Sequence, residues 1–201
     1  MSRIAVIGGH GKVALHLNRI LSDRGDVVSA VIRNPDHSAE VKESGATPVV
    51  ADVEQLATED VATLFADHDA VVWAAGAGGG SRERTYAVDR EAAIRAMDAA
   101  GQAGAQRFVM ISYFGAGPAH GVPESEPFFA YAEAKAAADA YLRESSLEWT
   151  VLGPSGLTLD PATGKIETGD QGFGGGSVSR ENVAQVIAAA LADDSTIRRT
   201  I

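Results

Sequence analysis

The chain has 201 residues, of which 45% are hydrophobic and 22% charged, so it can bury one sizeable core and disorder is not expected. Its formal net charge of −10 argues against a nucleic-acid or anionic-membrane surface, because both partners attract positive charge. The absence of cysteine excludes a disulfide framework, a thiolate metal site and a cysteine nucleophile.

Two further absences narrow the class of protein. No apolar run approaches the roughly 20 residues that a membrane-spanning helix needs, and the N-terminus enters an apolar strand without a secretory leader. The five histidines are scattered, and no pair has the spacing typical of metal ligands, so we expect no metal site. We therefore expect a cytoplasmic protein that binds neither nucleic acid nor membrane.

Short apolar runs alternate with segments of helical periodicity from end to end. Strands are expected at 3–7, 27–32, 47–51, 70–74, 107–111 and 149–152, a short strand at 165–168 and an edge strand at 196–201. Helices are expected from the first turn to residue 21 and at 37–43, 59–65, 84–103, 128–143 and 179–191, with loops at 115–127 and 156–176. This alternation predicts an α/β protein with a Rossmann-type doubly wound parallel sheet, helices on both faces and one domain over residues 1–201.

The first strand breaks into a glycine-rich turn that opens the first helix. Its spacing, Gly8-x-x-Gly11-x-x-Ala14, is typical of a turn whose backbone approaches a pyrophosphate at the helix N-terminus. The alternative is that the glycines serve only the packing of the helix on the sheet. We predict cofactor-binding residues along the whole turn, namely Gly8, Gly9, His10, Gly11, Lys12 and Val13.

The end of the second strand distinguishes between the two nicotinamide dinucleotides. NAD favours a carboxylate there, which accepts from the ribose 2′-hydroxyl, but Asp26 precedes the strand and so lies at the opposite edge of the sheet. Arg33 follows the strand, where a guanidinium suits a 2′-phosphate and no carboxylate is expected to repel it. The alternative is that Arg33 is a solvated loop residue. The sequence therefore favours NADP over NAD.

Two further strand ends complete the expected cofactor cleft. Asp52 and Val53 follow the third strand, a position that meets the adenine edge in such folds, although an Asp after a strand also serves as a helix cap. Ala74, Ala75 and Gly76 end the fourth strand in small residues, which let a dinucleotide pass close to the backbone.

Tyr131 and Lys135 form a second constellation. Residues four apart share one face of a helix, so the phenol and the ammonium point the same way. A neighbouring ammonium, helped by an oxidised nicotinamide, favours the phenolate and lowers the tyrosine pKa from its usual value of ~10. Ser112 ends the fifth strand, where its hydroxyl reaches a substrate oxygen. The alternative is a chance pair on an ordinary helix.

Taken in order, these motifs resemble those of the atypical short-chain dehydrogenase/reductases. The narrower resemblance is to the small NAD(P)H-binding subgroup labelled sugar epimerase-like or NAD-dependent epimerase/dehydratase-like. The motifs are Gly8-x-x-Gly11-x-x-Ala14, Ala74-Ala75-Gly76, Val88-Asp89, Phe108-Val109-Met110-Ile111-Ser112 and Tyr131-x-x-x-Lys135. The resemblance implies a Rossmann fold with bound NADP or NAD. It also implies that Tyr131 is the general acid/base, Ser112 orients the carbonyl or hydroxyl, and Lys135 holds the nicotinamide ribose and lowers the Tyr131 pKa.

The leading hypothesis is an NADP-dependent oxidoreductase that moves a hydride to or from a small carbonyl or alcohol. A substrate-side region is expected within about residues 113–127 and 153–178. The substrate stays open because Tyr113 and Gly153 depart from the family pattern on this side. The alternatives are epimerase or dehydratase chemistry, a non-catalytic NADP(H)-sensing regulator with a protein partner, and a flavin or quinone acceptor. The sequence leaves the oligomeric state undetermined.

Overall fold

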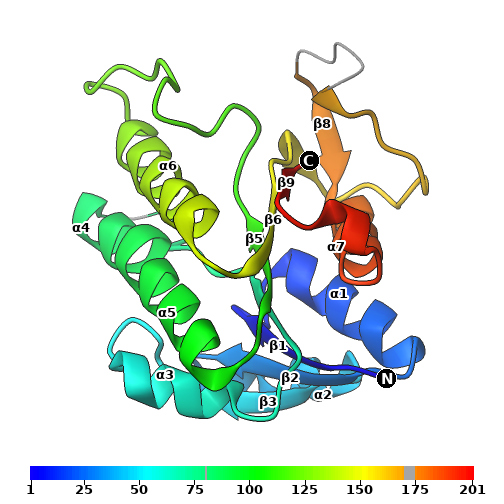
Figure 1. Cartoon of the computed structure of the whole chain (residues 1–201). Coiled ribbons are helices and arrows are strands. Elements are labelled where there is room, and N and C mark those ends of the chain that lie inside the picture. Colours follow the sequence, from blue (N-terminus) through cyan, green and yellow to red (C-terminus); the bar gives the residue numbers. More distant parts are fainter. Residues whose placement is uncertain (80, 170–174) are drawn as a thin grey trace.

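A parallel sheet of seven strands forms the centre of the computed structural model, which describes residues 1–79, 81–169 and 175–201 (Figure 1). The strands are β1 (Arg3–Ile7), β2 (Val27–Ile32), β3 (Thr47–Val50), β4 (Ala70–Trp73), β5 (Arg107–Ile111), β6 (Glu148–Leu152) and β9 (Arg199–Thr200). Their spatial order is β3-β2-β1-β4-β5-β6-β9, and all neighbouring pairs run parallel. The order reverses between β1 and β4, and doubly wound sheets bind ligands outside the carboxyl ends of such strands. The predicted fold class is confirmed.

Helices cover both faces of the sheet (Figure 1). One face carries α1 (Lys12–Asp23), α2 (Ser38–Glu43) and α7 (Arg180–Ala190), and the other carries α3 (Thr58–Phe65), α5 (Ala93–Ala103) and α6 (Phe129–Glu144). Shorter turns are η1 (Pro35–His37), α4 (Arg82–Thr85) and η4 (Asp194–Thr196). The inner strands β1, β2, β4, β5 and β6 are mostly apolar because helices bury both of their faces, whereas the edge strands β3 and β9 are more exposed. Within the described residues, no helix has the length and apolar character needed to cross a membrane.

The helix predicted over 84–103 contains an irregular segment. Between α4 and α5 the chain forms a π-helical stretch, η2 (Tyr86–Ala92), and α4 begins two residues earlier than predicted. Asp89 lies in this stretch, is buried, and accepts the backbone N–H of Ala77 through its carboxylate at 3.0 Å. Wider helical turns of this kind are frequent at functional sites. An apolar period of three to four residues fits both helix types, so the sequence pattern does not reveal the irregularity.

A small parallel pair of strands, β7 (Gly156–Thr158) and β8 (Ser177–Ser179), lies beside the main sheet within the described part of the chain. The strand predicted at 165–168 is wrong, and β7 lies where the sequence predicts a loop. Three-residue strands show too little alternation to be recognised. Ser179 is the N-cap of α7 as predicted, since its Oγ accepts the N–H of Asn182 at 3.1 Å. Residues 170–174 of the predicted substrate-side region lie outside the described residues.

Candidate functional site

The glycine-rich turn is pressed against the strands of its own sheet. Gly8 has φ +78°, and a Cβ there would lie 2.7 Å from the backbone of Ala75 after β4. A Cβ on Gly9 would lie 2.5 Å from the Cβ of Ala30 in β2. Both glycine N–H groups donate to the carbonyl of Val31, at 3.1 and 3.0 Å. Glycine is therefore required at these two positions so that the turn can pack against the sheet. This is the packing role that the sequence left open as the alternative to cofactor binding.

The first turn of α1 is open to an anion. Its N-cap is Gly11, and no side chain of the described residues caps the first-turn N–H groups. The turn begins with Lys12 and contains no acidic residue. Uncapped N–H groups at the positive end of the helix dipole bind phosphate. The residues present therefore fit a dinucleotide pyrophosphate through the start of α1 rather than through the first two glycines.

A cavity of about 300 Å³, here called the cofactor cleft, lies at the carboxyl ends of β1 to β4. Nine of the predicted cofactor-binding residues line it: Gly8, His10, Gly11, Arg33, Asp52, Val53, Ala74, Ala75 and Gly76. The other three, Gly9, Lys12 and Val13, are outside its wall, and Gly9 and Val13 are buried behind it. Four strand ends thus meet in one cleft, at the place where doubly wound sheets bind dinucleotides.

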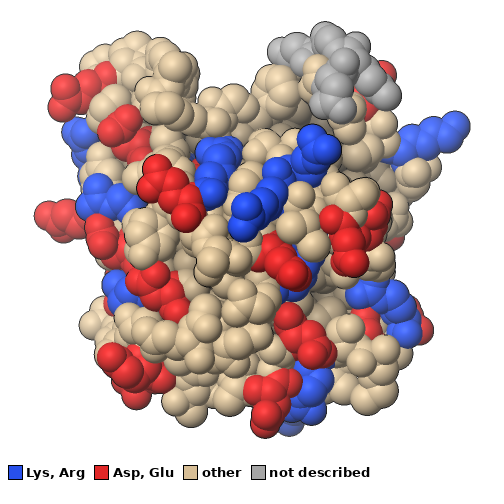
Figure 2. Space-filling model, in the orientation of Figure 1, with Lys and Arg blue, Asp and Glu red and all other residues tan. Residues whose placement is uncertain are grey.

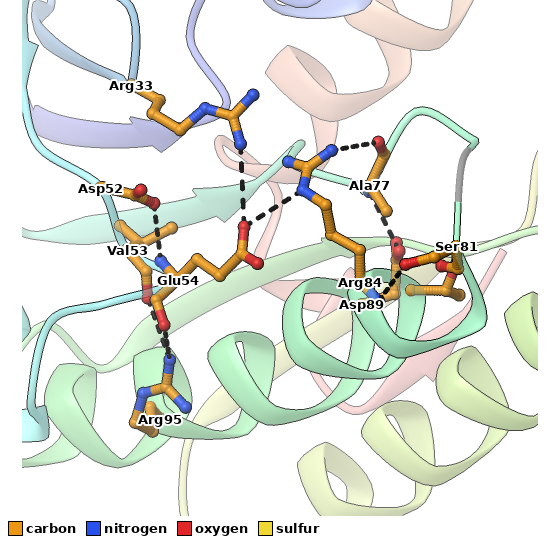
Figure 3. A network of polar contacts seen from close by, with 10 residues as sticks. Arg33, Asp52, Val53, Glu54, Ala77, Ser81, Arg84, Asp89 and Arg95 are labelled. Atoms are coloured by element: carbon orange, nitrogen blue, oxygen red, sulfur yellow. Dashed lines mark hydrogen bonds and ion pairs between the residues drawn. The ribbon is translucent and has the colours of Figure 1, made fainter.

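Asp52 begins a turn and does not cap a helix. Its Oδ1 accepts the backbone N–H of Glu54 at 3.1 Å, and the N-cap of α3 is Ala57. The helix-cap alternative for Asp52 is therefore wrong. Arg95 of α5 donates to the carbonyl oxygens of Val53 and Glu54, at 3.1 and 3.0 Å. These contacts fix the segment that follows β3 onto α5 (Figure 3).

Arg33 lies at the end of β2 as predicted, but a carboxylate stands beside it. Glu54 Oε2 lies 3.7 Å from Arg33 Nη1 and 3.4 Å from Arg84 Nε (Figure 3). The expectation that no carboxylate is present there is wrong, because β3 pairs with β2 and places the residues after β3 beside the end of β2. Arg33 is a paired cation in the cleft wall, and 57% of its side chain is exposed.

Two histidines stack at the rim of the cofactor cleft. The ring of His10, from the glycine-rich turn, lies 3.6 Å from the ring of His37 in η1, with 16° between their planes. His10 Nε2 also lies 2.5 Å from Glu40 Oε2 in α2. Both histidines line the cleft, so the glycine-rich turn and η1 form one wall beside the end of β2, and α2 supports this wall through Glu40.

Ser112 follows β5, and its hydroxyl has a buried carboxylate as its partner. Ser112 Oγ donates to Asp139 Oδ2 of α6 at 2.6 Å, and both residues are buried. The other carboxylate oxygen of Asp139, Oδ1, has no hydrogen-bond partner in the described residues. Burial raises the pKa of Asp139, while the Lys135 ammonium and the Ser112 hydroxyl oppose the rise. A hydroxyl carries one proton, so beside an ionised Asp139 the oxygen of Ser112 acts only as an acceptor toward a substrate.

Lys135 is buried, and two carboxylates act on its ammonium. Its Nζ lies 3.2 Å from the sulfur of Met110 in β5. Burial lowers the pKa of Lys135, whereas Asp139 of α6 and Asp89 of η2 oppose this. The pKa of the buried Asp89 is in turn raised by burial. A buried ammonium needs opposite charge nearby. The charges of Lys135 and Asp139 in α6 and of Asp89 in η2 therefore link η2 to α6 inside the protein.

The pKa of Tyr131 is raised. Burial is the largest cause, and the negative charges of Asp89 and Asp139 add to it. The expectation that Lys135 lowers this pKa is therefore wrong for the protein by itself, because burial and the nearby carboxylates favour the protonated phenol. The ring of Tyr131 lies 5.7 Å from the ring of Tyr113.

Asp139 joins two of the three predicted catalytic residues. Ser112 hydrogen bonds to Asp139, and the charge of Asp139 acts on Lys135. In the described residues, Tyr131 makes no direct hydrogen bond to either Ser112 or Lys135. Its phenol is affected electrostatically instead, since the negative charges of Asp89 and Asp139 raise its pKa. Ser112 and α6 thus meet at Asp139, with Tyr131 two helical turns away along α6.

A larger cavity of about 750 Å³, here called the large cavity, lies between α6, the loop after β5 and the β7–β8 pair. Figure 2 shows the molecule hollowed between the lobe that carries α6 and the lobe that carries β8. Among the described residues, the two cavities share no wall residue. Tyr113 and Asp139 belong to the wall of the large cavity, and each carries a buried oxygen with no partner in the described residues.

Sequence reasoning missed Asp139 and Glu54 and assigned no role to Asp89. A signal for Asp139 exists, because Tyr131, Lys135 and Asp139 are spaced four apart on one alanine-rich helix. Glu54 has no such signal, since its partners Arg33 and Arg84 are far away in the chain.

Comparison with known proteins agrees with this fold. The model of the NAD(P)H-binding family matches residues 8–194. The uncharacterized sugar epimerase YhfK of Bacillus subtilis is 32% identical over 98% of this chain and 91% of that relative. A solved structure named as an NAD-dependent epimerase/dehydratase from Bacillus halodurans has TM-score 0.90 and 34% identity, covering 100% and 92% of the two chains. The oxidoreductase ylbE from Lactococcus lactis has TM-score 0.86 and 28% identity, covering 98% and 88%.

Proposed function

Because the chain belongs to the NAD(P)H-binding family, we propose that it is an NADP-dependent oxidoreductase that moves a hydride to or from a carbonyl or alcohol. The membership agrees with the resemblance found in the sequence and makes the chain one of the NAD(P)-dependent oxidoreductase- and epimerase-like proteins. One observation supports the proposal most. The cofactor cleft ends at β4, and the neighbouring strand β5 leads to the buried pair of Ser112 and Asp139.

The proposed cofactor contacts follow the wall of the cleft. The uncapped start of α1 holds the pyrophosphate, and Arg33 holds the 2′-phosphate. Asp52 and Val53 would hold the adenine, and the small residues 74–76 would leave room for the dinucleotide beside the end of β4. The preference for NADP is supported by Arg33 in the cleft wall, because Glu54, the carboxylate beside it, is shared with Arg84.

In the proposed reaction the bound dinucleotide supplies or accepts the hydride, and the chain positions the substrate and moves the proton. The raised pKa of Tyr131 keeps its phenol protonated at neutral pH, so Tyr131 donates the proton when a carbonyl is reduced. Ser112 orients the same oxygen. Lys135 would hold the nicotinamide ribose, the role that the family resemblance implies, with Asp89 and Asp139 balancing its charge.

The large cavity is the proposed substrate side. Its wall includes residues from both ranges expected for it, 113–127 and 153–178. A volume of about 750 Å³ is in the range that accommodates drug-sized ligands, so the substrate need not be as small as the sequence suggested. The unpartnered oxygens of Tyr113 and Asp139 suit a substrate that carries polar groups beside the reacting carbon.

Consumption of NADPH tests the proposed reaction. We expect the protein, given NADPH and a panel of carbonyls, quinones and oxidised flavins, to oxidise one NADPH for each carbonyl or other acceptor reduced. The loss of absorbance near 340 nm, together with product analysis, measures this ratio. Product formation without net loss of NADPH would contradict an oxidoreductase and support the alternative of epimerase or dehydratase chemistry, which the names of two relatives favour.

A sensing role is the remaining alternative. A regulator that only binds NADP(H) has no need of the proton donor, so a Tyr131/Lys135 double variant would keep its effect. The buried cluster around Lys135 favours the enzyme, because buried charges with shifted pKa values concentrate at catalytic sites. The cytoplasmic location and the absence of nucleic-acid and membrane partners stay predictions.

A further inference from the structure

A carboxylate stands between two arginines that come from different sides of the cofactor cleft. Glu54 follows β3 and Arg33 follows β2, whereas Arg84 belongs to α4, beyond β4 (Figure 3). All three residues line the cleft. Glu54 Oε2 is 3.4 Å from Arg84 and 3.7 Å from Arg33, so one oxygen faces both guanidinium groups.

Glu54 is held in place by its own backbone. Its N–H donates to Asp52 Oδ1, and its carbonyl oxygen accepts from Arg95, which also binds the carbonyl of Val53. Only 17% of the Glu54 side chain is exposed. Because the backbone is fixed and the side chain is mostly buried, the carboxylate is a built part of the cleft wall rather than a freely moving surface acid.

The position of this carboxylate decides what Arg33 can offer to a cofactor. Arg33 is the residue proposed to meet the 2′-phosphate, and Glu54 already neutralises part of its charge. The negative charge of Glu54 also repels a 2′-phosphate, whereas it acts weakly on the uncharged 2′-hydroxyl of NAD. Arg84 opposes this effect, since it is the nearer partner of Glu54 and is itself held by a bond of 3.1 Å to the Ala77 carbonyl.

We propose that Glu54 limits the preference of the cleft for NADP over NAD, and that Arg84 weakens this limit by pairing with Glu54. The inference rests on the proposed function, because it concerns how the same cleft discriminates between two dinucleotides. It adds two residues to the specificity site, neither of which lies at the end of β2.

The test is calorimetric titration of the full chain with NADPH and with NADH. In Glu54→Gln we expect the ratio of the NADH to the NADPH dissociation constant to rise about tenfold, since one negative charge near a phosphate is removed. In Arg84→Gln we expect the ratio to fall, because Glu54 then pairs with Arg33 alone. In the Glu54→Gln/Arg84→Gln double variant the arginine substitution should change the ratio little, since its effect passes through Glu54.

Glu59→Gln is the matched control. Glu59 is exposed in the first turn of α3 and takes part in no ion pair of the described residues, so its substitution removes one charge without changing the ratio. Equal changes in NADPH and NADH affinity in Glu54→Gln would overturn the inference. An arginine effect of the same size with and without Glu54 would overturn the role of Arg84. Failure of the wild-type chain to bind either dinucleotide would instead refute the proposed function and, with it, the inference.

Discussion

Replacing Tyr131 by phenylalanine is expected to lower the turnover of NADPH by on the order of 10²–10⁴-fold, the usual contribution of a positioned proton donor. The ring and its packing on Tyr113 are kept, so the change removes only the hydroxyl. NADPH affinity should stay unchanged, because the proposed cofactor cleft does not include Tyr131. Steady-state kinetics together with a direct binding titration measure both quantities.

Tyr141→Phe provides the matched control for this prediction. Tyr141 lies on the same helix, and its hydroxyl donates to the exposed Asp98 of α5 at 2.6 Å, away from the site. Its loss should leave turnover near the wild-type value. Because the pKa of Tyr131 is raised, wild-type carbonyl reduction should not lose this proton donor across the neutral pH range. If Tyr131→Phe kept the wild-type turnover, the role of Tyr131 as proton donor would be refuted.

Replacing Asp139 by asparagine is expected to change the pH dependence of carbonyl reduction. An ionised Asp139 accepts the single hydrogen bond that the Ser112 hydroxyl can donate. A neutral Asp139 instead donates a hydrogen bond to Ser112, so the Ser112 hydroxyl is free to donate to the substrate oxygen. Wild-type reduction should therefore rise as the pH falls through the raised pKa of Asp139. In Asp139→Asn the amide donates to Ser112 at every pH, so this limb of the profile should flatten.

The same variant gives a readout that needs no substrate. The folded-state pKa of Asp139 lies above its unfolded value of ~3.9, so the folded protein holds a proton that the unfolded chain has released. The stability gained from this proton is complete below ~pH 4 and is lost as the pH rises through the folded-state pKa. As the pH rises through this window, the melting temperature of Asp139→Asn should therefore rise relative to that of the wild type. Parallel curves for the two proteins would contradict the prediction, and Asp98→Asn controls for the loss of one charge.

The main sheet was predictable because its strands are short and apolar and end at residues that break the pattern. Ile4 to Ile7 and Val71 to Trp73 are buried on both faces, and such runs are visible without a structure. The β7–β8 pair was not predictable, because its strands are three residues long and lie about 20 positions apart in the chain. Their pairing depends on tertiary contacts rather than on local pattern.

The cofactor cleft was predictable where a strand end alone defines the position, as at Gly11, Asp52 and Ala75. The charge balance around Arg33 was not, since it depends on the register of β3 beside β2 and on Arg84 from beyond β4. The pKa of Tyr131 was misjudged for a related reason. The sequence shows that Lys135 lies four residues from Tyr131, but it does not show the burial of the phenol or the nearby carboxylates Asp89 and Asp139, which raise its pKa.

Dinucleotide binding tests the central claim most directly. A ligand at about 100 times its dissociation constant adds about 2.7 kcal/mol to the free energy of unfolding, which raises the melting temperature of a domain of this size by about 5–10 °C. Thermal unfolding with NADPH, NADP, NADH and NAD at one concentration should show this rise with NADPH and NADP and a smaller one with NADH and NAD. An unchanged melting temperature with all four dinucleotides, even at millimolar concentration, would contradict the account.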